Sequence, residues 1–164
     1  MERSRRTLVG AVMTLALLAG CSSGFGATSL KPYSPADGVQ ADSGDLRVLN
    51  ALVVAGEDGS TGLVSATVVN RGDRNDRLTD VTSPDATVVL AGTSDLPASG
   101  ALTLGSGTDP SASATGLGKA AGENITLTFS FARTSPVTVR TVVVAATGYY
   151  AEMGPSPATS PPSP

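Results

Sequence analysis

The chain has 164 residues, with 11 Lys and Arg against 14 Asp and Glu, one cysteine and no histidine. Without histidine it lacks the commonest general base and transition-metal ligand, which excludes every Ser-His or Cys-His catalytic pair. A single thiol excludes a disulfide within the chain, and a net charge of −3 without a basic stripe argues against nucleic acid as a partner. We therefore expect a protein that is not an enzyme and holds no cofactor, although a hydrolase using carboxylates alone stays open.

The N-terminus predicts an export signal over residues 1–20. Residues 1–7, MERSRRT, hold three arginines, and residues 8–19 are uncharged and rich in Leu, Val and Ala. Such a stretch is typical of the apolar region of a signal peptide, and it is shorter than the roughly 20 residues that a membrane-spanning helix needs. Residues 18–21, LAGC, resemble the bacterial lipobox, whose cysteine is acylated on sulfur and becomes the new N-terminus after cleavage.

Cys21 is therefore the predicted lipid-attachment site. Each buried methylene of an acyl chain such as palmitate contributes about 0.8 kcal/mol, and two or more chains hold a protein stably on a bilayer. The alternative, a buried core cysteine, does not suit a position directly after an apolar export segment. The prediction is a protein anchored by its acyl chains to the extracytoplasmic face of the cell membrane. The mature chain keeps 8 Lys and Arg against 13 Asp and Glu, so its polypeptide adds no attraction to anionic lipids.

Two segments of low complexity are expected to flank one folded domain. Residues 21–42 mix Ser, Gly, Pro, Ala and Asp, which cannot bury enough apolar surface to offset the entropy of ordering, and predict a lipidated flexible linker. Residues 151–164 end in GPSPATSPPSP and predict a disordered, Pro-rich tail. The domain is expected over residues 43–150.

Within the domain, apolar residues recur at every second position. In residues 125–131, ITLTFSF, the apolar side chains alternate with Thr and Ser, which is typical of a half-buried strand. Further strands are predicted at 45–55, 62–70, 78–82, 87–90, 101–104, 111–116 and 137–143. Turn residues separate nearly all of them. The pattern predicts an all-β fold, an antiparallel Ig-like β-sandwich with Phe129 and Phe131 as its bulkiest core residues.

The densest run of charge, residues 70–84, contains a candidate interaction loop formed by Asp73, Arg74, Asn75, Asp76 and Arg77. One hypothesis is a calcium loop from Asp73, Asn75 and Asp76. Calcium prefers six to eight oxygen ligands, and arginines interleave with the acids here, so a solvated connection with ion pairs is favoured. This loop is where we expect an envelope protein or a small ligand to bind.

A family resemblance rests on the motifs NRGDRNDRLTDVTSP at 70–84, Gly122–Glu123 and ITLTF at 125–129. They resemble those of the periplasmic copper chaperone family PCu(A)C, over about 100 residues. Together with the lipobox and the Pro-rich tail, they make the chain similar to actinobacterial lipoproteins of the LpqE type. The resemblance implies a cupredoxin-like β-sandwich.

The same resemblance implies where copper would be held. The family's first His position falls near Ala91, and its His-x-Met falls at Ser111 and Ser113. The loop 93–100, where the family has methionine, has none. We therefore expect the fold to carry over and the metal site not to, so that no metal ligand is assigned.

Two readings of function follow from the sequence. The first is a membrane-anchored envelope lipoprotein whose sandwich is a non-catalytic binding or interaction module. The alternative is a copper or metal-homeostasis chaperone of the PCu(A)C type with a degenerate or non-standard metal site.

Overall fold

The computed structural model describes residues 37–155. These residues form ten strands and one short 3-10 helix. The elements are β1 (Val39–Ser43), β2 (Leu46–Ala55), β3 (Thr61–Asn70), β4 (Asp76–Thr82), β5 (Thr87–Ala91), β6 (Asp95–Leu96), β7 (Ala101–Leu104), β8 (Ser111–Thr115), β9 (Asn124–Phe131), β10 (Val137–Ala145) and η3 (Gly148–Tyr150). Within residues 37–155, no helix is long and apolar enough to cross a membrane.

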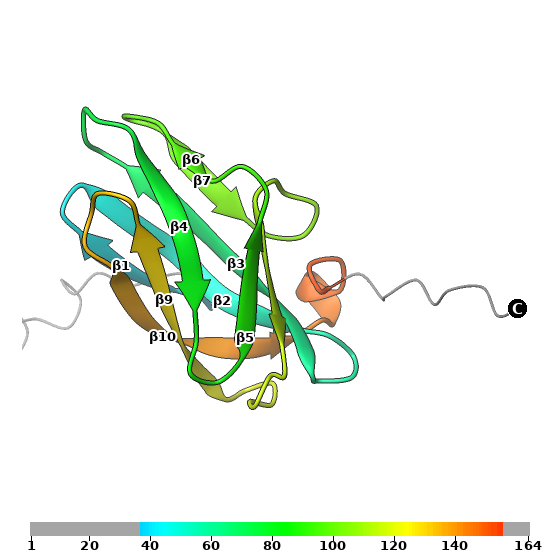
Figure 1. Ribbon diagram of the computed structural model, residues 1–164. Coiled ribbons are helices and arrows are strands. Elements are labelled where there is room, and N and C mark those ends of the chain that lie inside the picture. The colour runs from blue at the N-terminus through cyan, green and yellow to red at the C-terminus, as the bar shows by residue number, and fades with distance from the viewer. Residues whose placement is uncertain (1–36, 156–164) are drawn as a thin grey trace, which may run out of the picture. The chain divides into compact units, whose positions relative to one another are not determined.

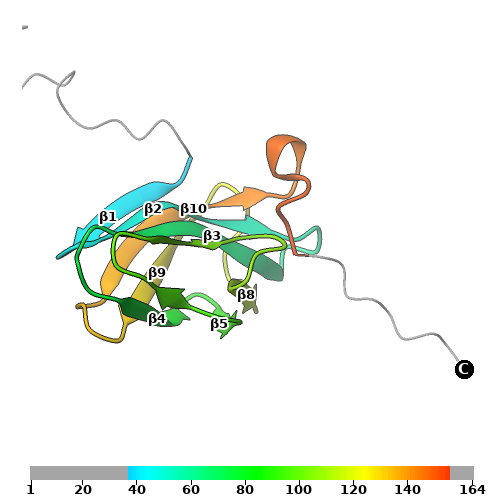
Figure 2. The same cartoon turned by 90° about the horizontal axis from the view of Figure 1, so that it is seen from above.

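The strands form a single curled sheet that folds over on itself as a sandwich. Its hydrogen-bonded order is β5-β8-β3-β2-β10-β9-β4-β6, with β1 added beside β2 and β7 beside β3. Seen from above, β1, β2 and β3 lie in one layer, and β4 and β5 lie in the facing layer (Figure 2). β10 joins the layers, because its first part pairs antiparallel with β9 and its last part pairs with β2.

The core lies between the two layers and is built from side chains at alternate positions. In β9, Ile125, Leu127 and Phe129 are at most 1% exposed, while the residues between them are only half-buried. Val, Leu, Ile and Ala supply nearly all the rest of the core, and Phe129 is the largest side chain in it that is fully buried. The alternation expected from the sequence is thus the alternation between core and solvent.

The eight predicted strands are confirmed, with ends shifted by at most two residues. The sequence did not predict β1 or β6. Because β1 pairs with β2, residues 39–42, which were expected in the linker, belong to the sandwich. The expectation of a purely antiparallel sheet is also wrong at one place, since β10 and β2 pair in parallel through residues 143–145 and 53–55. The predicted signal, Cys21 and residues 156–164 of the predicted tail lie outside the described residues.

Four connections meet at one end of the sandwich, which we call the polar end. They are residues 44–45, 71–75, 97–100 and 132–136, between β1 and β2, β3 and β4, β6 and β7, and β9 and β10. Backbone hydrogen bonds link the first three of them, from Arg71 N–H to the Asp45 carbonyl at 2.9 Å and from Ser99 N–H to the Gly72 carbonyl at 3.0 Å. The fourth is tied to the start of β4, since Ala132 N–H donates to the Arg77 carbonyl at 3.0 Å. The strands bring these four segments together from across the sequence (Figure 1).

Candidate functional site

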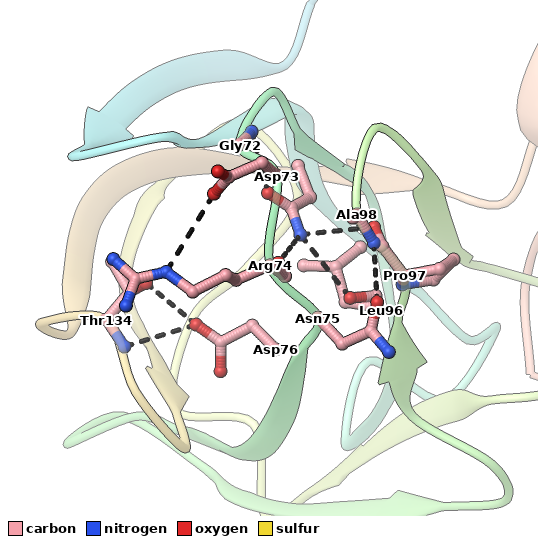
Figure 3. A network of polar contacts seen from close by, with 10 residues as sticks. Gly72, Asp73, Arg74, Asn75, Asp76, Leu96, Pro97, Ala98 and Thr134 are labelled. Carbon is pink, nitrogen blue, oxygen red and sulfur yellow. Dashed lines mark hydrogen bonds and ion pairs between the residues drawn. The ribbon is translucent and has the colours of Figure 1, made fainter.

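The loop between β3 and β4 is held in place by the side chain of Asn70, the last residue of β3, which is 2% exposed. Its Nδ2 donates hydrogen bonds to the carbonyl oxygens of Arg74 at 2.8 Å and Pro97 at 3.1 Å, and its Oδ1 accepts one from Gly72 N–H at 3.0 Å. Figure 3 shows the polar network around these contacts, with Gly72, Arg74 and Pro97 labelled. Because a buried amide must be paired to be tolerated, these contacts fix the loop against the segment that follows β6.

Asn75 extends the same contact. Its Oδ1 accepts a hydrogen bond from the backbone N–H of Ala98 at 2.9 Å (Figure 3). The loop is therefore tied to the 97–100 segment by two asparagine side chains, one buried and one at the surface. Asn75 Oδ1 is thereby occupied by a donor from the protein itself.

Asp76, the first residue of β4, ties the same region to the loop between β9 and β10. Its side chain is 8% exposed. Oδ1 accepts hydrogen bonds from the backbone N–H of Arg77 at 2.8 Å and of Arg133 at 3.0 Å. Oδ2 accepts them from the backbone N–H of Thr134 at 3.1 Å and from its hydroxyl at 2.7 Å. Burial acts to raise the pKa of Asp76, but the four donors together outweigh it and lower that pKa below its usual value of 3.8.

The charges around this network form ion pairs at the surface. Arg77 Nε lies 2.8 Å from Asp95 Oδ1, and both side chains are more than 60% exposed. Arg74 Nε lies 3.8 Å from Asp73 Oδ1, with both side chains almost fully in solvent. Exposed pairs of this kind contribute about 0–1 kcal/mol each, so the buried Asn70 and Asp76, and not the ion pairs, shape the loop.

Two adjoining pockets open at the polar end. The first, which we call the polar pocket, has a volume of about 300 Å³. It is lined by Asp45, Leu46, Asn70, Gly72, Arg74, Asn75, Asp76, Arg133 and Thr134. The second, the flanking pocket, has a volume of about 480 Å³ and adds Arg77, Asp95, Leu96, Pro97 and Ala132. Asn75, Asp76 and Arg133 line both pockets, which are therefore parts of one depression.

The structure brings together four of the five predicted loop residues. Arg74, Asn75 and Asp76 line the polar pocket and Arg77 lines the flanking pocket, while Asp73 points into solvent with 96% of its side chain exposed. The expectation of a solvated connection is wrong for Asp76, which is buried. The oxygens that a calcium ion would need at Asn75 and Asp76 already accept hydrogen bonds. Within residues 37–155, no group of three or more His, Cys, Asp or Glu side chains is placed to hold a metal ion.

Sequence reasoning missed Asp45, Arg133 and Thr134. They come from turns that lie 25 or more residues from the 70–84 run, and no local pattern sets them apart. Only the pairing of β4 with β9, which places Leu78 opposite Phe131, brings residues 132–134 beside Asp76. The signal that could have found them is therefore strand register, which a single sequence does not provide.

The positions where the resemblance places copper ligands lie on β5 and β8. Ala91 pairs directly with Ser111, and Val89 pairs with Ser113. The next turn is closed by Asp109, whose Oδ1 accepts a hydrogen bond from Thr93 N–H at 2.8 Å and would lie 1.8 Å from any Cβ at Gly92. Copper(I) as a cargo prefers sulfur and imidazole ligands, so a methyl group and two hydroxyls do not fit it. The pairing of β5 with β8 that would hold a copper site is present, but the sulfur and imidazole ligands for copper(I) are missing from these positions.

Comparison with known proteins supports the β-sandwich fold and identifies a family. Residues 46–144 match the family described as "Putative lipoprotein LpqE-like". Among solved structures, the apo PCuAC domain from PmoF1 is 22% identical, with a TM-score of 0.59 over 65% of this chain and 99% of that one. The copper-bound PCuAC domain from PmoF2 is 23% identical, with a TM-score of 0.58 over 65% of this chain and 98% of that one. A search of curated proteins finds no match.

At these identities the structural neighbours establish the fold, while the family match covers more than half of the sequence. The chain thus has the cupredoxin-like sandwich of the PCuAC domains (PCu(A)C), and it belongs to the LpqE-like family of lipoproteins.

Proposed function

We propose that this protein is a lipid-anchored cell-envelope lipoprotein whose sandwich is a non-catalytic binding module, with the polar end as its binding surface. The observation that carries the proposal is the contrast between two parts of the fold. The copper-ligand positions hold Ala91, Ser111 and Ser113, whereas the polar end holds an ordered depression built by Asn70 and Asp76. A rigid scaffold that presents loops in this way is the usual design of a binding module.

Anchoring through Cys21 is the first part of the proposal. It is supported by the family description, which names a lipoprotein, and by the LAGC sequence at 18–21. We expect Cys21→Ser to shift the protein from the membrane fraction to the soluble fraction, or to leave it uncleaved with its leader. Fractionation followed by mass spectrometry of the N-terminal peptide measures this. Efficient membrane retention of a cleaved Cys21→Ser protein would contradict lipid attachment at this residue.

Binding at the polar end is the second part, and site-specific photo-cross-linking in intact cells tests it. A cross-linking residue replaces Arg74, whose side chain is 77% exposed beside the polar pocket. The matched control replaces Arg140, which is exposed on β10 and lines neither pocket. We expect position 74, and not position 140, to form a covalent adduct. The mass of the adduct shows whether it contains a protein or a small ligand. The same adducts from both positions, or none from position 74, would contradict the proposal.

A copper-homeostasis role is the second candidate. One observation favours it, namely that the fold is shared with a domain solved in a copper-bound form. In this role, copper would have to be held by oxygen ligands or by a partner that supplies sulfur, because Met153 is the only methionine or cysteine within residues 37–155.

A further inference from the structure

Two opposite charges line the polar pocket without a partner. Asp45 and Arg133 are both exposed, and neither side chain has a hydrogen bond or an ion pair with another of the described residues, 37–155. They do not pair with each other either. Of the other two charges of this pocket, Asp76 accepts four hydrogen bonds, whereas Arg74 has only an exposed ion pair with Asp73 at 3.8 Å. Among the described residues, the pocket therefore offers a carboxylate, that of Asp45, and a guanidinium, that of Arg133, with no side-chain partner.

The side chain of Asp45 lies against the loop that carries Gly72. A Cβ atom at Gly72 would lie 2.8 Å from Asp45 Oδ2, closer than real Cβ atoms come, and 3.0 Å from Asp45 Cβ, which is a tight contact. Glycine at 72 therefore leaves this space to the Asp45 side chain. The Asp45 carbonyl also accepts the hydrogen bond from Arg71 N–H, so both the backbone and the side chain of Asp45 contact the same turn.

The backbone of Arg133 is held in position by Asp76. Its N–H donates to Asp76 Oδ1 at 3.0 Å, and the next residue, Thr134, donates twice to Oδ2. Asp76 thus fixes the turn that carries Arg133 at the wall shared by both pockets. The planar guanidinium of Arg133 presents a fixed set of donors that match a carboxylate or a phosphate.

We propose that the polar pocket binds a small zwitterion, with the ammonium group of the ligand at the Asp45 carboxylate and its oxyanion at the Arg133 guanidinium. A volume of about 300 Å³ suits a ligand of few heavy atoms. A zwitterion of this kind can come from two sources. One is a free small molecule, such as an amino acid or phosphoethanolamine, and the other is the phosphoethanolamine headgroup of a lipid. The inference rests on the proposed function, because it names the ligand class of the same polar end.

In the test, the full mature protein is kept in detergent and titrated with glycine or with O-phosphoethanolamine. Binding is monitored by the NMR chemical shifts of the Asn75 and Thr134 amides. Acetate and methylammonium, which carry one charge each, are the comparison probes. We expect a zwitterion to shift these amides, and each single-charge probe to bind at least about tenfold more weakly, since each loses one charge-assisted contact. The absence of a shift with either zwitterion, or equal binding of a single-charge probe, would overturn the proposal without any variant being needed.

Three variants extend the test. We expect Asp45→Asn and Arg133→Gln each to weaken zwitterion binding by about tenfold or more. Arg140→Gln removes the same charge as Arg133→Gln outside both pockets and should leave binding unchanged. Equal losses in the two arginine variants would mean non-specific charge and would overturn the proposal.

Two further experiments distinguish a lipid headgroup from a free zwitterion, and the zwitterion proposal from the proposed function. Vesicles of phosphatidylcholine with and without phosphatidylethanolamine are added to the protein. Shifts of Asn75 and Thr134 only with the phosphatidylethanolamine vesicles identify a lipid headgroup, and shifts only with the soluble probes identify a free zwitterion. If neither source binds while the cross-linker at position 74 still captures an adduct that position 140 does not, the zwitterion proposal fails and the proposed function stands.

Discussion

Replacing Phe129 with Ala should lower the free energy of unfolding by about 3–5 kcal/mol, because the cost of deleting a fully buried aromatic ring includes both lost transfer energy and a residual cavity. Phe129 is 0% exposed and lies on β9 opposite Val137 of β10 and Val81 of β4. Domains of this size have a stability of about 5–15 kcal/mol, so the loss removes a large share of it. Urea unfolding followed by circular dichroism measures the change.

Val89→Ala is the matched control for this prediction. Val89 lies on β5 with 57% of its surface exposed, and the loss should stay within about 0.5 kcal/mol. A Phe129→Ala effect as mild as that of Val89→Ala would contradict the placement of Phe129 in the core between the two layers.

Asp76→Ala should destabilise the fold by about 2–4 kcal/mol, because hydrogen bonds to a buried charge contribute about 1.5–3 kcal/mol and three backbone N–H groups lose their acceptor. Those groups belong to Arg77, Arg133 and Thr134. Asp73→Ala is the control on the same loop, since Asp73 is 96% exposed and its loss should cost no more than about 0.5 kcal/mol. Equal effects of the two variants would contradict the role of Asp76 as the tie between the two loops.

The same contacts give this prediction a pH dependence. The pKa of Asp76 is lower in the folded state than its ordinary value of 3.8, so its stabilising contribution is complete above pH 3.8 and is lost as the pH falls through the folded pKa. The difference in stability between wild type and Asp76→Ala should therefore be constant near neutral pH and shrink below pH 3.8. Hydrogen bonds with Ser60 and Thr61 also lower the pKa of Asp58, to about 2. Asp58 is present in both proteins, so its effect cancels in the difference between them.

The strands that the sequence predicted are those with large apolar residues at every second position. β9 and β10 bury their alternate residues as expected. β1 was missed because VQADS has only Val39 and Ala41 to bury, and both are only half-buried against β2. β6 has two residues, too few for any period to show. Strands that depend on their neighbours for stability leave little trace in their own sequence.

The candidate site was predicted only in part for a related reason. Residues 73–77 stood out by their charge, but charge density does not distinguish Asp73, which lies in solvent, from Asp76, which accepts four hydrogen bonds. That difference is made by Arg133 and Thr134, 57 and 58 positions away in the sequence. The pocket is a product of strand register, and its two unpartnered charges could be recognised only in three dimensions.

The central claim is that this chain keeps the PCuAC fold without a copper site of its own, and a copper(I) titration of residues 22–164 tests it most directly. This segment contains the whole sandwich and no thiol, and Met153 is its only methionine. In competition with a chromophoric copper(I) chelator, we expect the protein to withdraw no stoichiometric copper, and Met153→Leu to change nothing. Tight binding of one copper(I) per chain would contradict the account and restore the chaperone reading.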